Sequence, residues 1–121
     1  MRALLVVGSA FAAISVLFGA FGAHILKSRL SIEDLTIFET AVRYQMYHSL
    51  GIMIMGLTSF YIPHNLISLP SYLMIFGTII FSGTLYLIVF TNLRWMGAIT
   101  PVGGLCLIFG WLIFAYNIYR S

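Results

Sequence analysis

The sequence predicts an all-α fold, an integral membrane bundle of four transmembrane helices. Of 121 residues, 61% are hydrophobic and 7% are charged, against about 45–50% and 25% in soluble domains. No Asp, Glu, Lys or Arg occurs between Arg43 and Arg94, a run long enough to cross a bilayer twice at about 20 residues per crossing. We expect one transmembrane domain, 1–121, with helices at about 3–24, 32–62, 70–91 and 97–119.

The first apolar segment, Ala3–Ala23, contains no charge and is flanked by Arg2, Lys27 and Arg29. It fits a spanning helix; a cleaved signal peptide is the alternative, although this stretch exceeds the roughly 7–15 residues of a signal core. Small residues recur in it every three or four positions, which puts them on one helical stripe that allows close packing in lipid. These helix-packing residues are Gly8, Ala12, Ser15, Gly19 and Gly22.

The second helix is predicted to begin after Ser31, which forms a capping-box pattern with Asp34. The mainly apolar part of this helix runs only from Leu50 to Tyr61. As a helix this stretch is about 18 Å long, whereas the hydrocarbon core of a bilayer is roughly 30 Å thick. To span the bilayer, the membrane-embedded part of this helix must also include the residues from Phe38 onward. It therefore carries four polar residues to or below the headgroup level: Glu39, Arg43, Gln45 and His48.

Prolines mark the boundaries of the remaining helices. Pro63 ends the second helix, and Pro70 can occupy the first turn of the third, where its missing N–H costs nothing. In that helix the hydroxyls of Ser82–Thr84 can bond back to the helix's own carbonyls. Thr100 is predicted to cap the fourth helix, with Pro101 at its first position.

Glu39 and Arg43 are four residues apart with the acid on the N-terminal side, the favourable orientation for a helical ion pair. Charged groups at membrane depth cost at least about 2.5–3.5 kcal/mol each, so they normally pair, face the bundle or line a wet cavity. Two interpretations stay open. Either the pair fixes how this helix docks, or Glu39 titrates in a functional site.

Histidine and cysteine give little support for a metal site. His24 and His48 are candidates for a proton relay or a metal ligand, but neither has a Cys, Asp, Glu or His three or four residues away. Helix-packing roles are favoured, and no metal is expected. Cys106 is the single cysteine and lies in an apolar segment, which favours an inert buried thiol.

Several functional classes receive no support from the sequence. The six basic residues are scattered, whereas nucleic-acid binding needs a basic patch. Glycine-rich phosphate loops, nucleophile elbows and paired zinc histidines are absent. We therefore expect no enzyme activity, no cofactor and no nucleic-acid partner.

Three stretches together resemble a known membrane family. They are Gly19–His24 (GAFGAH), Phe38–His48 (FETAVRYQMYH), and Phe81–Tyr86 (FSGTLY) continuing to Arg94-Trp95 and Thr100–Gly104. The chain resembles, over nearly its whole length, the family of domain of unknown function 423, which is similar to the eukaryotic transmembrane protein 256 group. The resemblance implies four helices and a bacterial cytoplasmic membrane, and it brings no activity. It singles out a polar pattern: His24, Glu39, Arg43, Tyr44, Gln45, His48, Arg94 and Thr100.

The sequence favours a small multi-pass membrane protein with a structural or accessory role and an intramembrane polar cluster. The alternative is a small transporter or proton pathway that uses Glu39 and His48. The expected partners are the lipid bilayer and either a second copy of the chain or another membrane protein. The positive-inside rule slightly favours a cytoplasmic location for the side that holds Lys27, Arg29 and Arg94.

Overall fold

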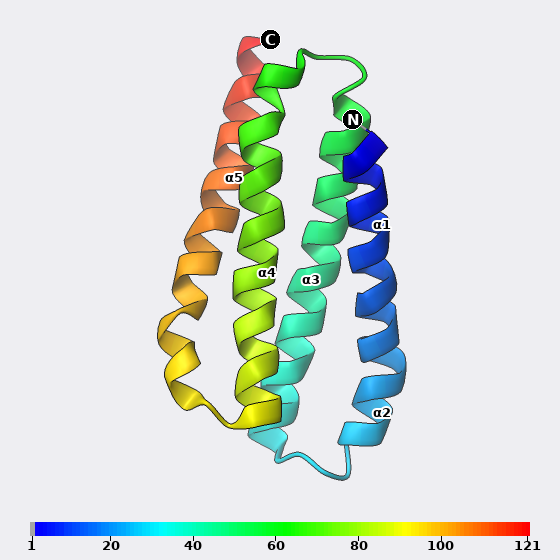
Figure 1. Cartoon of the computed structure of the whole chain (residues 1–121), viewed down its shortest axis with the longest axis vertical. Helices are drawn as coiled ribbons and strands as arrows, with labels where there is room; N and C mark the ends of the chain where they lie inside the picture. Colours follow the sequence, from blue (N-terminus) through cyan, green and yellow to red (C-terminus); the bar gives the residue numbers. More distant parts are fainter. Residues whose placement is uncertain (1) are drawn as a thin grey trace.

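The computed structural model describes residues 2–121, which form long helices joined by short connections (Figure 1). The first long segment has three consecutive parts: α1 (Arg2–Leu17), a π-helical turn η1 (Phe18–Gly22) and α2 (Ala23–Leu26). The other long helices are α3 (Ile32–Thr58), α4 (Ser68–Thr91) and α5 (Thr100–Arg120). Two short 3₁₀ segments, η2 (His64–Leu66) and η3 (Arg94–Ala98), precede α4 and α5.

The predicted all-α fold with four long helical segments is confirmed, and several helix ends differ from the expected positions, including the start of the last helix, at Thr100 rather than 97. α3 ends at Thr58 rather than near residue 62, because the chain tightens there into i→i−3 turns: the Phe60 N–H donates to the Leu57 carbonyl at 3.2 Å and the Tyr61 N–H to the Thr58 carbonyl at 2.9 Å. α4 begins at Ser68, which makes Pro70 its third residue. Pro70 therefore still lies in the first turn, where no helical partner is lost.

The expectation that Thr100 caps the last helix is wrong. Ile99 is the N-cap residue, and Thr100 is already the first residue of α5. Because η3 leads almost directly into α5, the Thr100 hydroxyl lies 3.2 Å from the carbonyl oxygen of Met96 and 2.6 Å from Oγ1 of Thr84. It therefore links α5 to α4 rather than satisfying the start of its own helix.

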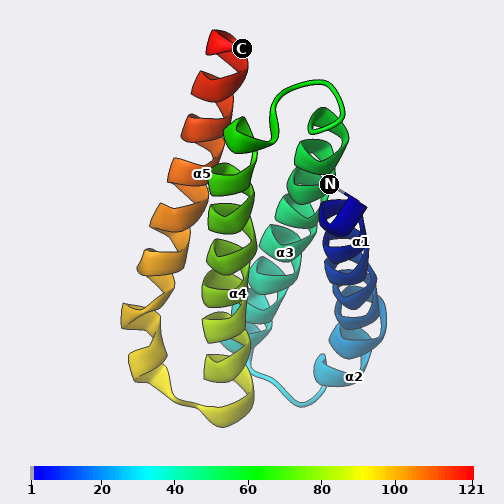
Figure 2. The same cartoon turned by 45° about the horizontal axis from the view of Figure 1, so that its top comes forward.

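The helices pack antiparallel in the order α1–α3–α4–α5, with α1 and α5 at the two edges (Figures 1 and 2). The two inner helices, α3 and α4, supply most of the fully buried large side chains. These are Phe38, Ile52 and Met55 on α3 and Met74 on α4, with Ile67 just before α4.

Glycines allow the closest backbone approaches. A Cβ at Gly103 of α5 would lie 2.9 Å from Phe81 Cα and 3.0 Å from the Gly77 carbonyl oxygen, both on α4. A Cβ at Gly8 of α1 would lie 2.8 Å from the Ser49 carbonyl oxygen on α3. Close approach through small residues is how helices associate in lipid, where burial from water supplies no driving force.

Local hydrogen bonds define the two ends of the molecule. At one end, Ser31 Oγ accepts from the Asp34 N–H at 3.1 Å, as the capping pattern predicted, and Asp34 forms an ion pair with Arg94 at 2.8 Å. Asn92, which ends α4, takes the left-handed conformation with φ 58° that suits a helix C-terminus. At the other end, Asn117 Nδ2 donates to the Leu66 carbonyl at 2.9 Å.

The outer surface is apolar over much of its area. Three helical stretches, residues 2–26, 68–91 and 94–120, are long and apolar enough to cross a membrane. α3 is not among them because its first half is polar. The arrangement is that of a four-helix membrane bundle in which the most polar helix holds an inner position.

Candidate functional site

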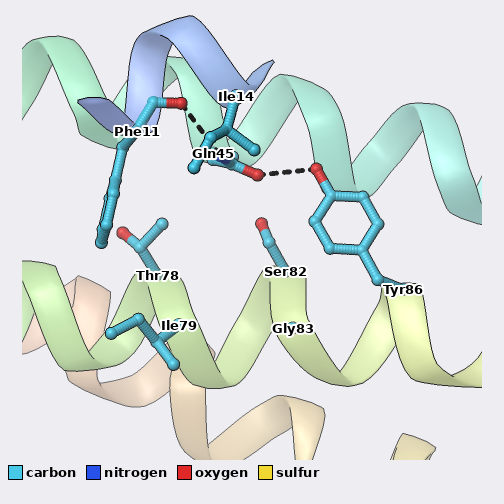
Figure 3. A pocket seen from close by; sticks show the side chains of 8 residues that line it. All are labelled: Phe11, Ile14, Gln45, Thr78, Ile79, Ser82, Gly83 and Tyr86. Atoms are coloured by element: carbon cyan, nitrogen blue, oxygen red, sulfur yellow. Dashed lines mark hydrogen bonds between the residues drawn. The ribbon is translucent and has the colours of Figure 1, made fainter. Parts of the chain in front are cut away.

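Gln45 on α3 is a buried polar side chain that bonds to two other helices. Its Nε2 donates to the Phe11 carbonyl of α1 at 2.9 Å, and its Oε1 accepts from the Tyr86 hydroxyl of α4 at 2.7 Å (Figure 3). We call Gln45, Tyr86 and the Phe11 carbonyl the Gln45 network. One carboxamide thus joins three helices, because it offers both donors and an acceptor.

Two further hydroxyl contacts link helices near this network. Ser82 of α4 donates to the Ala41 carbonyl of α3 at 2.8 Å, instead of to a carbonyl of its own helix as the sequence suggested. The Thr84 and Thr100 hydroxyls join α4 to α5 at 2.6 Å. Among residues 2–121, no buried side-chain nitrogen or oxygen lacks a hydrogen-bond partner.

A cavity of about 170 Å³ lies beside the Gln45 network. Its wall is mainly apolar, and the side chains of Ile14 and Ile79 that line it are also exposed at the surface. Figure 3 shows Gln45 and Tyr86 joined along one wall, with Ser82 and Thr78 rising from α4. The cavity is lined by Phe11, Ile14, Gln45, Thr78, Ile79, Ser82, Gly83 and Tyr86.

The π-helical turn positions aromatic rings around Tyr86. Phe18, the first residue of η1, lies edge-on to the Tyr86 ring with centroids 5.1 Å apart, and Phe38 of α3 lies 5.8 Å from the same ring. A π-helical turn inserts an extra residue and re-aims side chains, often at functional sites. The glycine pair Gly19 and Gly22 lies within this turn.

His48 and Tyr44 lie on another side of α3, where His48 is buried and Tyr44 is partly exposed. His48 is buried, its Nδ1 lies 2.7 Å from the Tyr44 carbonyl, and its ring lies 5.9 Å from Trp111 of α5. The Tyr44 ring packs on Phe81 of α4 at 4.7 Å. Among residues 2–121 no three His, Cys, Asp or Glu side chains lie close enough to hold a metal ion.

Glu39 and Arg43 lie on the outside of α3, and the predicted ion pair between them is not present. Among residues 2–121 an ion pair forms between Asp34 and Arg94 instead. The Arg43 guanidinium lies 3.5 Å from Thr40 Oγ1. Both charged residues border a second hollow of about 190 Å³ with Gly19 and Ala23 of the first helical segment.

The eight polar residues singled out by the sequence therefore occupy separate places. Gln45 lies in the three-helix network, and Tyr44 and His48 pack toward α4 and α5. Arg94 pairs with Asp34 at one end, and His24 is exposed near the end of α2. The structure does not bring them into one cluster.

The small-residue stripe of the first segment faces α3. Gly8 lies against Ser49 and Met53, Gly19 against Val42, and Gly22 against Phe38. Ser15 is buried and donates to the Phe11 carbonyl of its own helix at 3.0 Å, and Ala12 is half-buried.

Sequence reasoning missed Tyr86 and Ser82 as partners of α3. A signal for Tyr86 is present in the sequence: a tyrosine in an otherwise apolar spanning helix needs a partner for its hydroxyl when it is buried. Nothing local identifies that partner, because Gln45 and Tyr86 are 41 residues apart. The π-helical turn was missed because hydrophobic periodicity does not resolve one inserted residue.

The fold and these contacts define a small multi-pass helical membrane protein whose buried polar side chains bond within the protein. The chain belongs to the protein family of unknown function DUF423, whose family model matches residues 18–104. The family predicted from the sequence motifs is thus confirmed. The matched segment begins at the π-helical turn and includes Gln45, Ser82 and Tyr86.

Bacterial relatives match almost the whole chain. A UPF0382 membrane protein of Staphylococcus haemolyticus is 40% identical, covering 99% of this chain and 98% of the relative. A UPF0382 membrane protein of Staphylococcus epidermidis is 42% identical over 93% and 92% of the two chains. The UPF0382 membrane protein YwdK of Bacillus subtilis is 33% identical over 93% of each. No solved structure matches this chain.

Proposed function

We propose that this chain is a structural or accessory protein of the bacterial cytoplasmic membrane, a fixed helical unit that acts through its lipid-facing surface. The observation that carries the proposal is the internal pairing of buried polar groups. Gln45 uses both ends of its carboxamide on protein atoms, and Ser82 is bonded across helices. A site for reaction or transport needs polar groups that can exchange partners with a substrate.

The alternative of a proton pathway through Glu39 and His48 has less support. Glu39 is exposed, whereas His48 is buried beside Trp111. Nine residues separate them, about 13 Å along the helix axis and about half a turn around it. The hollow beside Glu39 does not include His48, and neither residue lines the cavity at Gln45.

A flux assay tests the proposal. The purified protein is reconstituted into vesicles that contain a pH-sensitive dye, and a pH gradient is imposed. We expect proton entry equal to that of protein-free vesicles, for the parent and for Glu39→Gln. Flux by the parent above the protein-free level would overturn the proposal, and its loss in a stably folded Glu39→Gln variant would assign Glu39 to the pathway.

A further inference from the structure

The outward side of α3 carries a continuous stripe of exposed residues. They follow each other at spacings of three or four positions, so they share one helical face. α1 and α4 pack on other faces of the same helix. We call this the outer stripe: Thr36, Glu39, Arg43, Tyr47, Leu50, Ile54 and Leu57.

The charged part of the outer stripe lies well inside the bundle's length. Arg43 is eleven residues from Ile32 and fifteen from Thr58, the ends of α3, or about 16 Å and about 22 Å along the axis. The bond between Ser82 and the Ala41 carbonyl shows that this level of α3 lies beside the interior of α4. Glu39 and Arg43 thus face outward at a depth where the neighbouring helix is apolar.

Glu39 and Arg43 form no ion pair with each other or with another side chain among residues 2–121. Lipid-exposed charged side chains are costly, and in membrane proteins they pair or face protein or a wet cavity. The recorded ion pair of the described chain, Asp34–Arg94, lies at the end of the bundle. Glu39 and Arg43 are exposed on the outer stripe, at the edge of the hollow that they share with Gly19 and Ala23, and a protein surface placed against this face would supply them with partners.

The charges on this surface are self-complementary. Two copies inserted in the same direction are related by a two-fold axis along the membrane normal, so their α3 helices run parallel. Glu39 and Arg43 lie about 40° apart, on either side of a line through Leu50. When the two α3 helices touch along the line through Leu50, the two-fold axis places Glu39 of one copy opposite Arg43 of the other.

The axial offset also suits this pairing. Arg43 lies about 6 Å above Glu39 along the helix, and helical side chains lean back toward the N-terminus, so the long arginine reaches the level of the glutamate. The symmetric contact contains this ion pair twice. Beyond it, Leu50, Ile54 and Leu57 give an apolar continuation of the same stripe.

We propose that the outer stripe is the interface for a second copy of this chain, held by reciprocal Glu39–Arg43 ion pairs. The inference rests on the proposed function, because it names the partner of the lipid-facing surface. An intrachain Glu39–Arg43 pair, formed by a rotamer change, is the competing explanation.

Charge reversal separates these explanations. Donor- and acceptor-labelled chains, carrying Ser121→Cys with Cys106→Ser, are reconstituted in phosphatidylcholine–phosphatidylglycerol vesicles at low protein-to-lipid ratio, and energy transfer is measured. We expect transfer for the parent and association at least about tenfold weaker for Glu39→Arg alone or Arg43→Glu alone. A mixture of the two variants restores transfer, because each position 39 then faces an opposite charge at position 43.

The control is Lys27→Glu, a charge reversal outside the outer stripe, which keeps the parent's transfer. Helical content by circular dichroism checks folding; if a reversed chain does not fold, Glu39→Gln and Arg43→Gln replace it and each is expected to weaken association. The inference is overturned if the parent shows no transfer, if folded single variants associate like the parent, or if the mixture does not recover. A monomeric chain without proton flux would leave the proposed function standing, whereas flux would overturn that function whatever the energy transfer.

Discussion

At the scale of single residues, Gln45 explains how a polar side chain is kept inside this bundle. An unpaired carboxamide in an apolar environment costs several kcal/mol on hydrocarbon scales, about 4–8. Here the donor and the acceptor are both used, on α1 and α4 respectively. The residue therefore holds α1, α3 and α4 together through one side chain.

Removing the Tyr86 hydroxyl tests this role. In Tyr86→Phe the Oε1 of Gln45 loses its donor at 2.7 Å, and we expect a loss of about 1 kcal/mol in the free energy of unfolding. Tyr72→Phe, on the same helix but exposed, is the matched control and changes it by less than about 0.5 kcal/mol. Reversible unfolding in mixed micelles measures both. Equal values for the two variants would mean that the Gln45–Tyr86 bond does not stabilise the fold.

Local residue patterns were predictable, whereas distant pairings were not. The cap formed by Ser31 was predicted because its partner Asp34 lies three residues away. The four-residue spacing of Glu39 and Arg43 predicted an ion pair that is absent. Thr40 lies three residues before Arg43, equally within reach, and the structure places the Arg43 guanidinium beside it. Spacing brings two side chains within reach, but rotamers and neighbours decide which contact forms.

At the scale of helices, the contact between α4 and α5 depends on glycine. A Cβ at Gly103 would lie 2.5 Å from the backbone nitrogen of Phe81 and 2.9 Å from its Cα, and backbone atoms cannot move aside at low cost. We expect Gly103→Ala to separate the two helices and to lower the unfolding free energy by about 1–3 kcal/mol.

Gly83→Ala provides the control for that substitution. No heavy atom lies within 4 Å of a Cβ at Gly83, and alanine is the better helix former by about 1 kcal/mol. We expect this variant to be at least as stable as the parent when thermal unfolding is followed by circular dichroism. A Gly103→Ala chain as stable as Gly83→Ala would contradict the close packing of α4 on α5.

The connections between helices allow a test at one end of the bundle. Asp34→Asn removes the ion pair with Arg94, which links the start of α3 to η3. The Arg94 side chain is half-exposed, so we expect a loss of only about 0.2–1 kcal/mol, smaller in high salt. Glu33→Gln, an exposed neighbouring acid, should have no measurable effect. A loss that does not change between low and high salt would assign the effect of Asp34→Asn to something other than the ion pair.

The helices differ in how far the sequence determined them. Four long apolar or partly apolar segments follow from composition and length, because a spanning helix needs about 20 residues. The π-helical turn at Phe18–Gly22 does not follow from length and composition; in the structure its first residue, Phe18, packs against Tyr86, which is far away in the sequence. Similarly, Thr100 resembled a cap by local pattern but bonds to Thr84, sixteen residues away.

At the scale of the whole molecule, the packing order explains why the most polar helix tolerates the membrane. α3 lies between α1 and α4 (Figure 2), so its buried polar residues are covered on two sides. What remains outward is the outer stripe, including Glu39 and Arg43. The fold thus leaves one helix face whose composition differs from that of the other lipid-facing surfaces.

The distribution of positive charge predicts the direction of insertion. One end of the bundle holds Lys27, Arg29 and Arg94, and the other holds Arg2 and Arg120. Arg43 lies nearer the first end, about 16 Å from the start of α3 against about 22 Å from its end, so its side chain extends toward that side as long basic chains do. Because positive residues are retained in the cytoplasm, we expect the first end to be cytoplasmic.

Single cysteines test this orientation in a Cys106→Ser background. Ser28→Cys lies in the connection between α2 and α3 and Asn65→Cys lies in η2, both exposed at opposite ends of the bundle. A membrane-impermeant maleimide added to intact cells should label Asn65→Cys at once and Ser28→Cys only after permeabilisation. The reverse pattern would contradict the charge argument. Labelling of both sites in intact cells would mean that copies insert in both directions.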